Sequence, residues 1–293
     1  MNVYEETQLI LHKYKIQANK SLGQNFLVDD NVIDEIIRSS NIDKQDLIIE
    51  IGPGLGVLTN RLLKEANNVI AVELDKRMVN ILQDRFILNI NDQAESKLEI
   101  INEDILKINL NEIIAEKRKQ TEIKNVKIVA NLPYYISTPI IMKLLENRLD
   151  IDEIIVMVQK EVAERLTAKT GTRLAGAITY AVEYYSDATS IIKVPKESFV
   201  PSPKVESEVI KLKVRKGKKI QVKDEKLLFN IISKSFMQRR KTLSNVLINN
   251  NIMHSKEDVK NMWKELEIDE NVRGESLTLE QFGEIADYIS EKK

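Results

Sequence analysis

The stretch Ile48-Ile49-Glu50-Ile51-Gly52-Pro53-Gly54-Leu55-Gly56 indicates the fold class of this 293-residue chain. A short apolar run that enters a glycine-rich turn and then a helical pattern predicts a strand followed directly by a helix. Glycines in such a turn let the backbone pass close to a ligand. A dinucleotide-binding fingerprint would place its third glycine at position 57, but that glycine comes one residue early and Val57 fills the place. Taken alone, the loop also fits a tight turn without a ligand.

Short apolar runs rich in β-branched residues alternate with stretches of helical period through the first half of the chain. This alternation predicts a doubly wound α/β sheet with crossover helices. The predicted strands are 47–51, 69–72, 98–101, 126–130 and 153–158, and the predicted helices are about 31–40, 57–64, 76–85 and 139–146.

The pattern changes in the second half of the chain. A helical stretch at about 175–185 precedes two runs, 190–194 and 206–214, which predict an antiparallel pair joined by the loop 195–205. Beyond the charged linker 216–219 only helical patterns follow, for example 225–236 and 256–266. We therefore expect a sheet domain at residues 1–215, with an antiparallel edge, and a small all-helical domain at residues 216–293.

Composition excludes several classes of protein. The charge is close to balanced, at −1, so bulk positive charge cannot hold a nucleic acid. The chain has no cysteine, and its two histidines, His12 and His254, are far apart in the sequence, which disfavours a metal site or a catalytic triad. An acidic N-terminus without a long apolar run predicts a soluble, cytoplasmic protein that is not bound to a membrane.

Acidic residues follow the second and third predicted strands. Glu73 lies about 20 residues beyond the first glycine, where a carboxylate can accept hydrogen bonds from both hydroxyls of a ribose. Asp104 follows the next strand and could accept from an adenine amino group. Because ligands bind at the carboxyl edge of such sheets, the set predicts a site for an adenosine-type ligand.

The fourth strand leads into Asn131-Leu132-Pro133-Tyr134. An exocyclic base nitrogen is a poor nucleophile because its lone pair is delocalised into the ring. The Asn131 amide oxygen and the Leu132 carbonyl could both accept from that amino group and turn the lone pair toward an electrophile. Pro133 fixes the backbone, and Tyr134 offers a face to a base extruded from its stack.

Together these motifs resemble the ribosomal RNA adenine dimethyltransferase family, and most closely its bacterial members that act on small-subunit (16S) rRNA. The likeness extends over nearly the whole chain and rests on residues 21–27 (Ser-Leu-Gly-Gln-Asn-Phe-Leu), 50–56, 72–75, 102–104, 131–134 and 199–207. The chain departs from the family at Ala175, where many members have tyrosine, and at Glu183, where glutamine is common.

The resemblance implies a Rossmann-like methyltransferase that uses S-adenosylmethionine and no metal. It implies that two adjacent adenosines near the 3′ end of small-subunit rRNA each receive two methyl groups on N6. It also implies that Phe199 packs on the target base opposite Tyr134. The residues predicted to contact the donor are Asn25, Leu27, Gly52, Gly54, Glu73, Asp104 and Asn131.

A basic segment could hold the RNA. Positions 211–241 carry 12 basic and 2 acidic residues, a net charge of +10, whereas positions 242–293 carry 6 basic and 11 acidic residues. At the end of the basic segment, residues 236–243 resemble a motif of the family's helical domain. We predict that Lys234, Arg239, Arg240 and Lys241 contact the RNA. Lys13, Lys15 and Lys20 are predicted to form a flexible basic arm. We expect the protein to be a monomer that binds an assembling ribosomal particle.

Three alternatives remain open at this stage. A large-subunit rRNA adenine methyltransferase of the macrolide-resistance type shares the glycine loop and an Asn-Leu-Pro-Tyr-like motif, but the match through 199–207 and 236–243 favours the small-subunit enzyme. A mainly non-catalytic ribosome assembly factor would use the donor pocket only as a checkpoint; intact Asn131, Tyr134, Glu73 and Asp104 favour retained catalysis, and the two roles could coexist. An NAD-dependent oxidoreductase is disfavoured by the glycine spacing and by the lack of an evident hydride-site histidine or lysine.

Overall fold

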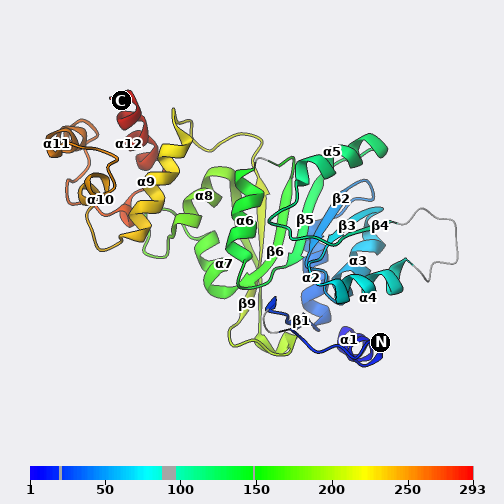
Figure 1. Ribbon diagram of the computed structural model, residues 1–293. Helices are drawn as coiled ribbons and strands as arrows, with labels where there is room; N and C mark the ends of the chain where they lie inside the picture. The colour runs from blue at the N-terminus through cyan, green and yellow to red at the C-terminus, as the bar shows by residue number, and fades with distance from the viewer. Residues whose placement is uncertain (20–21, 88–96, 148, 293) are drawn as a thin grey trace. The chain divides into compact units, whose positions relative to one another are not determined.

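The computed structural model describes residues 1–19, 22–87, 97–147 and 149–292 (Figure 1). Predictions for Lys20 and Ser21 lie outside these ranges. The described residues form two compact units. The first comprises Met1–Ala163 and Thr189–Val214, and the second comprises Glu164–Ala188 and Arg215–Lys293.

A seven-stranded sheet forms the centre of the first unit. Its strand order is β4-β3-β2-β5-β6-β9-β7, in which β2 to β6 pair in parallel and β9 pairs antiparallel to β6. The α/β class with an antiparallel strand beside the parallel ones is therefore confirmed. The strands are β2 (Leu47–Ile51), β3 (Asn68–Val72), β4 (Leu98–Ile101), β5 (Val126–Asn131), β6 (Glu153–Gln159), β7 (Ser186–Val194) and β9 (Ser207–Val214).

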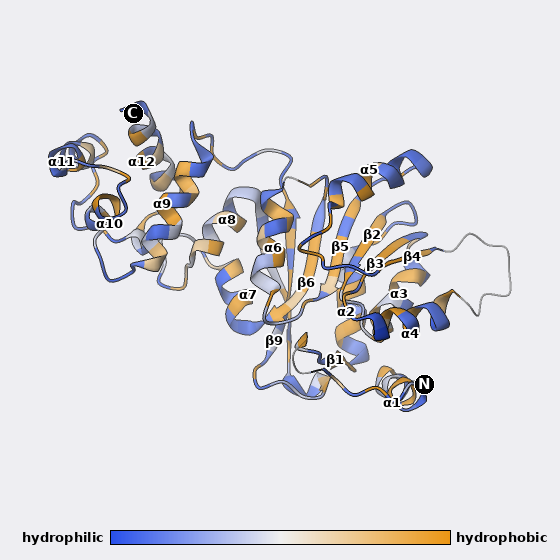
Figure 2. Cartoon of the chain, in the orientation of Figure 1, coloured by the Kyte–Doolittle hydropathy of each residue, from blue (hydrophilic) through white to orange (hydrophobic). Residues whose placement is uncertain are grey.

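Burial on both faces explains why the central strands are continuous apolar runs. All five residues of β2 are buried, with β3 on one side and β5 on the other; Ile49 is paired with Ile70 and with Ile128. Such two-sided burial is typical of parallel strands covered by helices. Figure 2 shows β2, β5 and β6 largely in the colours of apolar residues.

Helices precede or connect these strands. Asp29 caps α2 and Asp75 caps α4, each by accepting a backbone N–H of the first turn, as N-terminal carboxylates do. The helices of this part of the chain are α1 (Val3–Lys13), α2 (Asp30–Ser40), α3 (Val57–Glu65), α4 (Lys76–Phe86), α5 (Leu110–Gln120), α6 (Ser137–Glu146) and α7 (Lys160–Thr167), the last of which ends in the second unit.

Helix α1 corrects the prediction of a flexible basic arm. Asn2 and Glu5 form a capping box at its start, which is a sequence pattern that predicts a helix. Lys13 lies in its last turn and forms an ion pair with Asp84 of α4 at 2.9 Å. The N-terminal segment is therefore folded against the sheet domain.

Two further strands of two residues each lie outside the main sheet. β1 (Phe26–Leu27) pairs antiparallel with β8 (Phe199–Val200), so that Leu27 is opposite Phe199. A single turn of 3₁₀ helix, Lys196–Ser198, precedes β8. This pairing joins residues that are more than 170 positions apart, and no local pattern predicted it.

Helices form the second unit around a cluster of aromatic rings. The Tyr180 ring lies 5.3 Å from Phe236 and 5.2 Å from Phe282, while Tyr184 lies edge-on to Phe229. The helices are α8 (Ala177–Tyr185), α9 (Glu225–Met237), α10 (Leu243–Asn249), α11 (Lys256–Glu265) and α12 (Leu279–Glu291).

The aromatic cluster also corrects the predicted division of the chain. The sequence predicts a first domain of residues 1–215, which includes residues 164–188. In the structure α8 of this segment contributes Tyr180 and Tyr184 to the second unit, so the segment belongs with the C-terminal helices. Among the described helices, none is long and apolar enough to span a membrane.

Candidate active site

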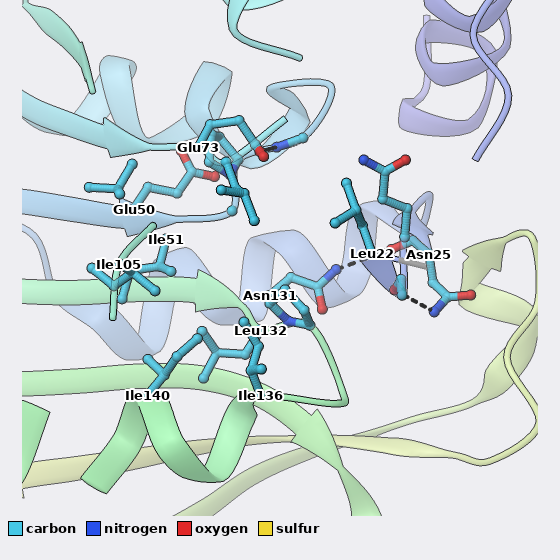
Figure 3. Close-up of a pocket in the computed structure, with 18 of the residues that line it drawn as sticks. Leu22, Asn25, Glu50, Ile51, Glu73, Ile105, Asn131, Leu132, Ile136 and Ile140 are labelled. Carbon is cyan, nitrogen blue, oxygen red and sulfur yellow. Dashed lines mark hydrogen bonds between the residues drawn. The ribbon is translucent and has the colours of Figure 1, made fainter. Parts of the chain in front are cut away.

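A pocket opens at the carboxyl ends of β2, β3 and β5, within the first unit (Figure 3). It encloses about 1080 Å³, counting the part open to solvent, which is the size of a small-molecule site. Residues 22–27, which lead into and form β1, line another side of it. Every residue predicted to contact the donor lines this pocket: Asn25, Leu27, Gly52, Gly54, Glu73, Asp104 and Asn131.

The glycine loop after β2 has two different functions. Gly52 and Gly54 adopt φ of +68° and +56° and border the pocket. A Cβ atom on Gly56, where φ is +79°, would lie 2.7 Å from side-chain atoms of both Leu82 and Phe86. The glycine that departs from the dinucleotide spacing is therefore required by the packing of α4 against the loop, and it does not line the pocket.

Two backbone N–H groups orient the Glu73 carboxylate. Gly54 N donates to one oxygen at 3.0 Å, and Asp75 N donates to the other at 2.8 Å. The side-chain amide of Asn102 donates to the Glu73 carbonyl at 2.8 Å and so connects the ends of β3 and β4. Burial raises the pKa of the Glu73 carboxyl, and the two N–H groups oppose that shift. The carboxyl is thus held in one orientation at the pocket wall.

Glu50 is a pocket residue that the sequence analysis did not assign to the site. It lies within β2, is 2% exposed and accepts a hydrogen bond from the Thr59 hydroxyl at 2.6 Å. Burial raises the pKa of its carboxyl to about 8, and the neighbouring Glu73 contributes to the rise. An acidic residue inside an otherwise apolar strand was the sequence signal that could have found it.

Asp104 lies in the turn after β4. Its Oδ1 accepts from Leu106 N at 2.9 Å, and its carbonyl accepts from Lys107 N at 2.8 Å, so the turn holds the side chain at the pocket. Lys143 of α6 donates to the carbonyls of Ile105 and Ile108 at 3.0 and 2.9 Å. The loop that carries Asp104 is therefore fixed from two sides.

The Asn131 side chain presents its amide oxygen as an acceptor. Its Nδ2 donates to the Asn25 carbonyl at 3.3 Å, as the dashed line in Figure 3 marks. Among the described residues, none donates to Asn131 Oδ1 or to the Leu132 carbonyl oxygen. The Leu132 N–H donates to the Met157 carbonyl at 3.1 Å, and Ile136 N donates to the Pro133 carbonyl at 3.2 Å. Two free oxygens thus occur side by side in the chain at a fixed turn.

Tyr134 and Tyr135 continue this turn along the pocket. Tyr134 is half-buried, and its phenol oxygen lies 2.7 Å from the Ser207 hydroxyl oxygen. Burial raises the pKa of the Tyr134 phenol, and the contact with Ser207 partly opposes the rise. Tyr135 is 53% exposed, with its ring packed beside Gly23.

Phe199 does not line the pocket. Its side chain is 3% exposed and packs in the hydrophobic core with Leu27 and other residues. The family resemblance predicts that Phe199 packs on the target base, but in the structure Phe199 is a core residue. The β1–β8 pairing accounts for this burial, since it covers Phe199 from the side of Leu27.

The four residues predicted to bind RNA lie at or near the end of α9 in the second unit. Arg240 and Lys241 are exposed, and neither side chain has a hydrogen-bond or ion-pair partner among the described residues. Arg239 instead donates to the Ala175 carbonyl at 2.6 Å and lies 4.9 Å above the Phe236 ring. Lys234 is partly buried.

The rest of the basic segment is partly neutralised. Lys218 is paired with Glu225, Lys219 with Glu183 and Lys223 with Glu291. The net charge of the segment therefore overstates the positive charge available to a partner. Glu183, one of the departures from the family pattern, has its partner in Lys219.

The strand order, and a pocket with acidic residues in one wall and Asn131 and Tyr134 in its lining, are those of a Rossmann-like, S-adenosylmethionine-dependent methyltransferase. A family model described as "Ribosomal RNA adenine dimethylase" matches residues 15–291. The chain therefore belongs to the ribosomal RNA adenine dimethylase family, and it is an adenine methyltransferase by class.

Curated relatives support this over the full length. The chain is 46% identical over 289 residues to "Ribosomal RNA small subunit methyltransferase A" of Lachnoclostridium phytofermentans, covering 98% of this chain and 97% of the relative. It is 42% identical over 292 residues to the protein of that name from Clostridioides difficile, covering 100% and 98%.

Solved structures agree on the fold. A dimethyladenosine transferase from Plasmodium falciparum superposes with a TM-score of 0.72 at 25% identity, covering 89% of this chain and 95% of that one. The 23S rRNA methyltransferase ErmE has a TM-score of 0.65 at 19% identity, covering 91% and 100%, and therefore supports the fold alone.

Proposed function

We propose that this protein transfers methyl groups from S-adenosylmethionine to N6 of two adjacent adenosines near the 3′ end of small-subunit (16S) rRNA, giving N6,N6-dimethyladenosine during small-subunit assembly. The small-subunit substrate is supported by full-length identity of 42–46% to relatives named as small-subunit methyltransferases. The chemistry is supported by two unpaired acceptor oxygens, on Asn131 and Leu132, at the rim of a pocket with an acidic wall.

The pocket residues fit an adenosine-type methyl donor. Glu73 is already held by two N–H groups with its carboxylate in the pocket, where it can accept from ribose hydroxyls. Asp104 is fixed at the next strand end, where it can accept from an amino group of the adenine. The positive φ of Gly52 and Gly54 leaves space that a side chain would fill. When bound, S-adenosylmethionine supplies a methyl group made electrophilic by its sulfonium.

Asn131 and Leu132 prepare the nucleophile. The Asn131 Oδ1 and the Leu132 carbonyl accept the two hydrogens of the target amino group and turn its lone pair out of conjugation, toward the methyl group. The Asn25 carbonyl prevents the Asn131 amide from turning its NH₂ to the substrate, because it already accepts from Nδ2. Tyr134 stacks on the extruded base. Most of the acceleration comes from this fixed geometry, in an in-line displacement.

No side chain is needed as a general base. Methyl transfer moves the positive charge of the sulfonium to N6, which is therefore strongly acidic and releases a proton to water. In the second transfer N6 has one hydrogen left, which one of the two oxygens, on Asn131 or Leu132, accepts. The other oxygen then has no hydrogen to accept, because the first methyl group has replaced it. We propose that one chain suffices, because all seven residues predicted to contact the donor line one pocket of the first unit.

Arg240 and Lys241, with Lys234, supply the positive charge that we propose holds the rRNA. Exposed groups that have no partner in the described part of the chain, as on Arg240 and Lys241, can neutralise phosphates, which gives affinity that falls steeply with salt. Selection of the target adenosines then comes from the shape of the assembling particle rather than from base readout.

The test is transfer from isotopically labelled donor to ribosomal subunits that lack the modification. Small and large subunits are treated in parallel, and the digested RNA is analysed by mass. We expect labelled N6,N6-dimethyladenosine from small subunits only. Label in large subunits would refute the substrate, and no label in either, with donor still bound, would indicate an assembly factor.

Asn131→Ala tests the mechanism in the same assay. Removal of one preorganised polar group lowers kcat about 10²- to 10³-fold. Asn60→Ala on α3 is a matched control, because Asn60 does not line the pocket. Equal turnover of the two variants would contradict the assigned role of Asn131.

A further inference from the structure

Ser207 is a buried polar residue beside the pocket that the mechanism above does not use. It is the first residue of β9, its side chain is 0% exposed, and it is paired with Gln159 at the end of β6. Since β9 runs antiparallel to β6, the start of β9 meets the carboxyl ends of the parallel strands, where Tyr134 lies. A strand of opposite direction thus delivers a side chain to the site edge.

The Ser207 hydroxyl has one partner among the described residues, the Tyr134 phenol at 2.7 Å. The two hydroxyl groups carry two hydrogens, and their mutual hydrogen bond uses one. A buried hydrogen without an acceptor is costly, whereas the half-buried Tyr134 can direct its hydrogen to water or to a ligand. The favoured arrangement therefore has Ser207 donating to the Tyr134 oxygen.

This contact restrains a ring that has few other polar restraints. Tyr134 follows Pro133 in a turn whose backbone is held by the Ile136–Pro133 hydrogen bond. The turn fixes the backbone of Tyr134, and the contact with Ser207 fixes the position of its phenol oxygen. A ring held at both ends can stack on a base without first losing conformational entropy.

We infer that Ser207 is a positioning residue for methyl transfer, which holds the Tyr134 ring in the plane that receives the target adenine. This role rests on the proposed function, because it requires that a base enters the pocket. In this role Ser207 contacts neither the substrate nor the donor. It acts through Tyr134, whose phenol oxygen it holds.

The experiment is a double-mutant cycle with Ser207→Ala and Tyr134→Phe. Each variant removes the same hydrogen bond from one end, so each is expected to lower kcat about tenfold, with the dissociation constant of the donor unchanged. The double variant is expected to lose no more than either single variant. The fraction of product left as N6-methyladenosine is expected to rise, because a slower second transfer competes less well with release of the singly methylated RNA.

Ser40→Ala is the matched control. Ser40 is also a 0% exposed serine with one short hydrogen bond, to the Ile36 carbonyl at 2.7 Å, but it ends α2 and does not line the pocket. Loss of a buried hydroxyl as such would therefore appear in Ser40→Ala as well, as a lower unfolding midpoint with unchanged kcat.

Three outcomes would overturn the inference. One is a kcat of Ser207→Ala equal to that of Ser40→Ala, and another is a double variant whose loss is the product of the two single losses. If Ser207→Ala fails to fold, Tyr134→Phe alone decides, since unchanged kcat would show that the phenol contact has no role. Absence of transfer by the unmutated protein would instead refute the proposed function itself.

Discussion

Glu50 makes this protein less stable as the pH rises, whereas a carboxylate that is paired with a cation makes a protein more stable as the pH rises. Its carboxyl is buried within β2, and its pKa is raised to about 8 from 4.5. Between these two values the folded protein keeps a proton that the unfolded chain releases. Stability is therefore greatest below about pH 4.5 with respect to this group, and it falls as the pH rises toward 8.

The size of the effect follows from that difference. The shift of about three and a half pH units, at about 1.36 kcal/mol per unit, corresponds to on the order of 5 kcal/mol in the free energy of unfolding. Glu50→Gln replaces the carboxyl by a neutral group that still offers an oxygen to the Thr59 hydroxyl. The variant lacks a group to ionise at this position, so it should not incur this loss.

Urea unfolding followed by circular dichroism, at pH values from 5 to 9, measures the difference. We expect the two proteins to be similarly stable at pH 5 and Glu50→Gln to be more stable by several kcal/mol above pH 8. Glu73 also has a raised pKa and is present in both proteins, so its own burial cancels in the comparison, while its repulsion of an ionised Glu50 is part of the difference measured. Parallel stability curves over the whole range would refute the reasoning, because they would mean that Glu50 is already ionised at neutral pH.

Three further outcomes test the packing and the charges. Gly56→Ala should lower the free energy of unfolding by about 2–4 kcal/mol, because the new side chain is strained at a positive φ and overlaps with α4. Gly54→Ala is its control, since Gly54 also has a positive φ but a Cβ there meets no atom closer than 3.5 Å. Lys127→Met should cost about 3–5 kcal/mol in chemical denaturation, because the fully buried Asp46 loses an ion pair of 2.7 Å; a loss below 1 kcal/mol would contradict this. Arg240→Ala should weaken binding to small subunits and reduce by about one the slope of log affinity against log salt, with the fold unchanged, and an unaltered slope would remove Arg240 from the RNA contacts.

Much of the sheet was predictable because its signals are local. The apolar runs of β2, β3 and β5 were located within one or two residues, since burial on both faces requires several successive apolar residues. The spacing from the glycine loop to Glu73 also predicted one wall of the pocket. Carboxyl ends of parallel strands meet at one edge, so the topology brings these residues together.

Other elements gave weak or misleading local signals. Helix α5 has only two buried residues, Leu110 and Ile114, and Figure 2 shows it as largely polar, so its pattern was not recognised. The capping box at Asn2 would have predicted α1. Arg239 was indistinguishable from Arg240 in the sequence, although the structure engages it with the Ala175 carbonyl.

The sequence by itself determined the class of fold, the motif Asn131-Leu132-Pro133-Tyr134 and the acidic residues of the pocket wall, because apolar runs and the residues that directly follow each strand are local features of the chain. Only the tertiary structure decided that Phe199 is a core residue, that Gly56 serves α4 and that Ser207 holds Tyr134. Those three facts arise from pairs separated by 26 to 172 positions. Such contacts form only when strands and helices pack, so the sequence near each residue does not predict its partner.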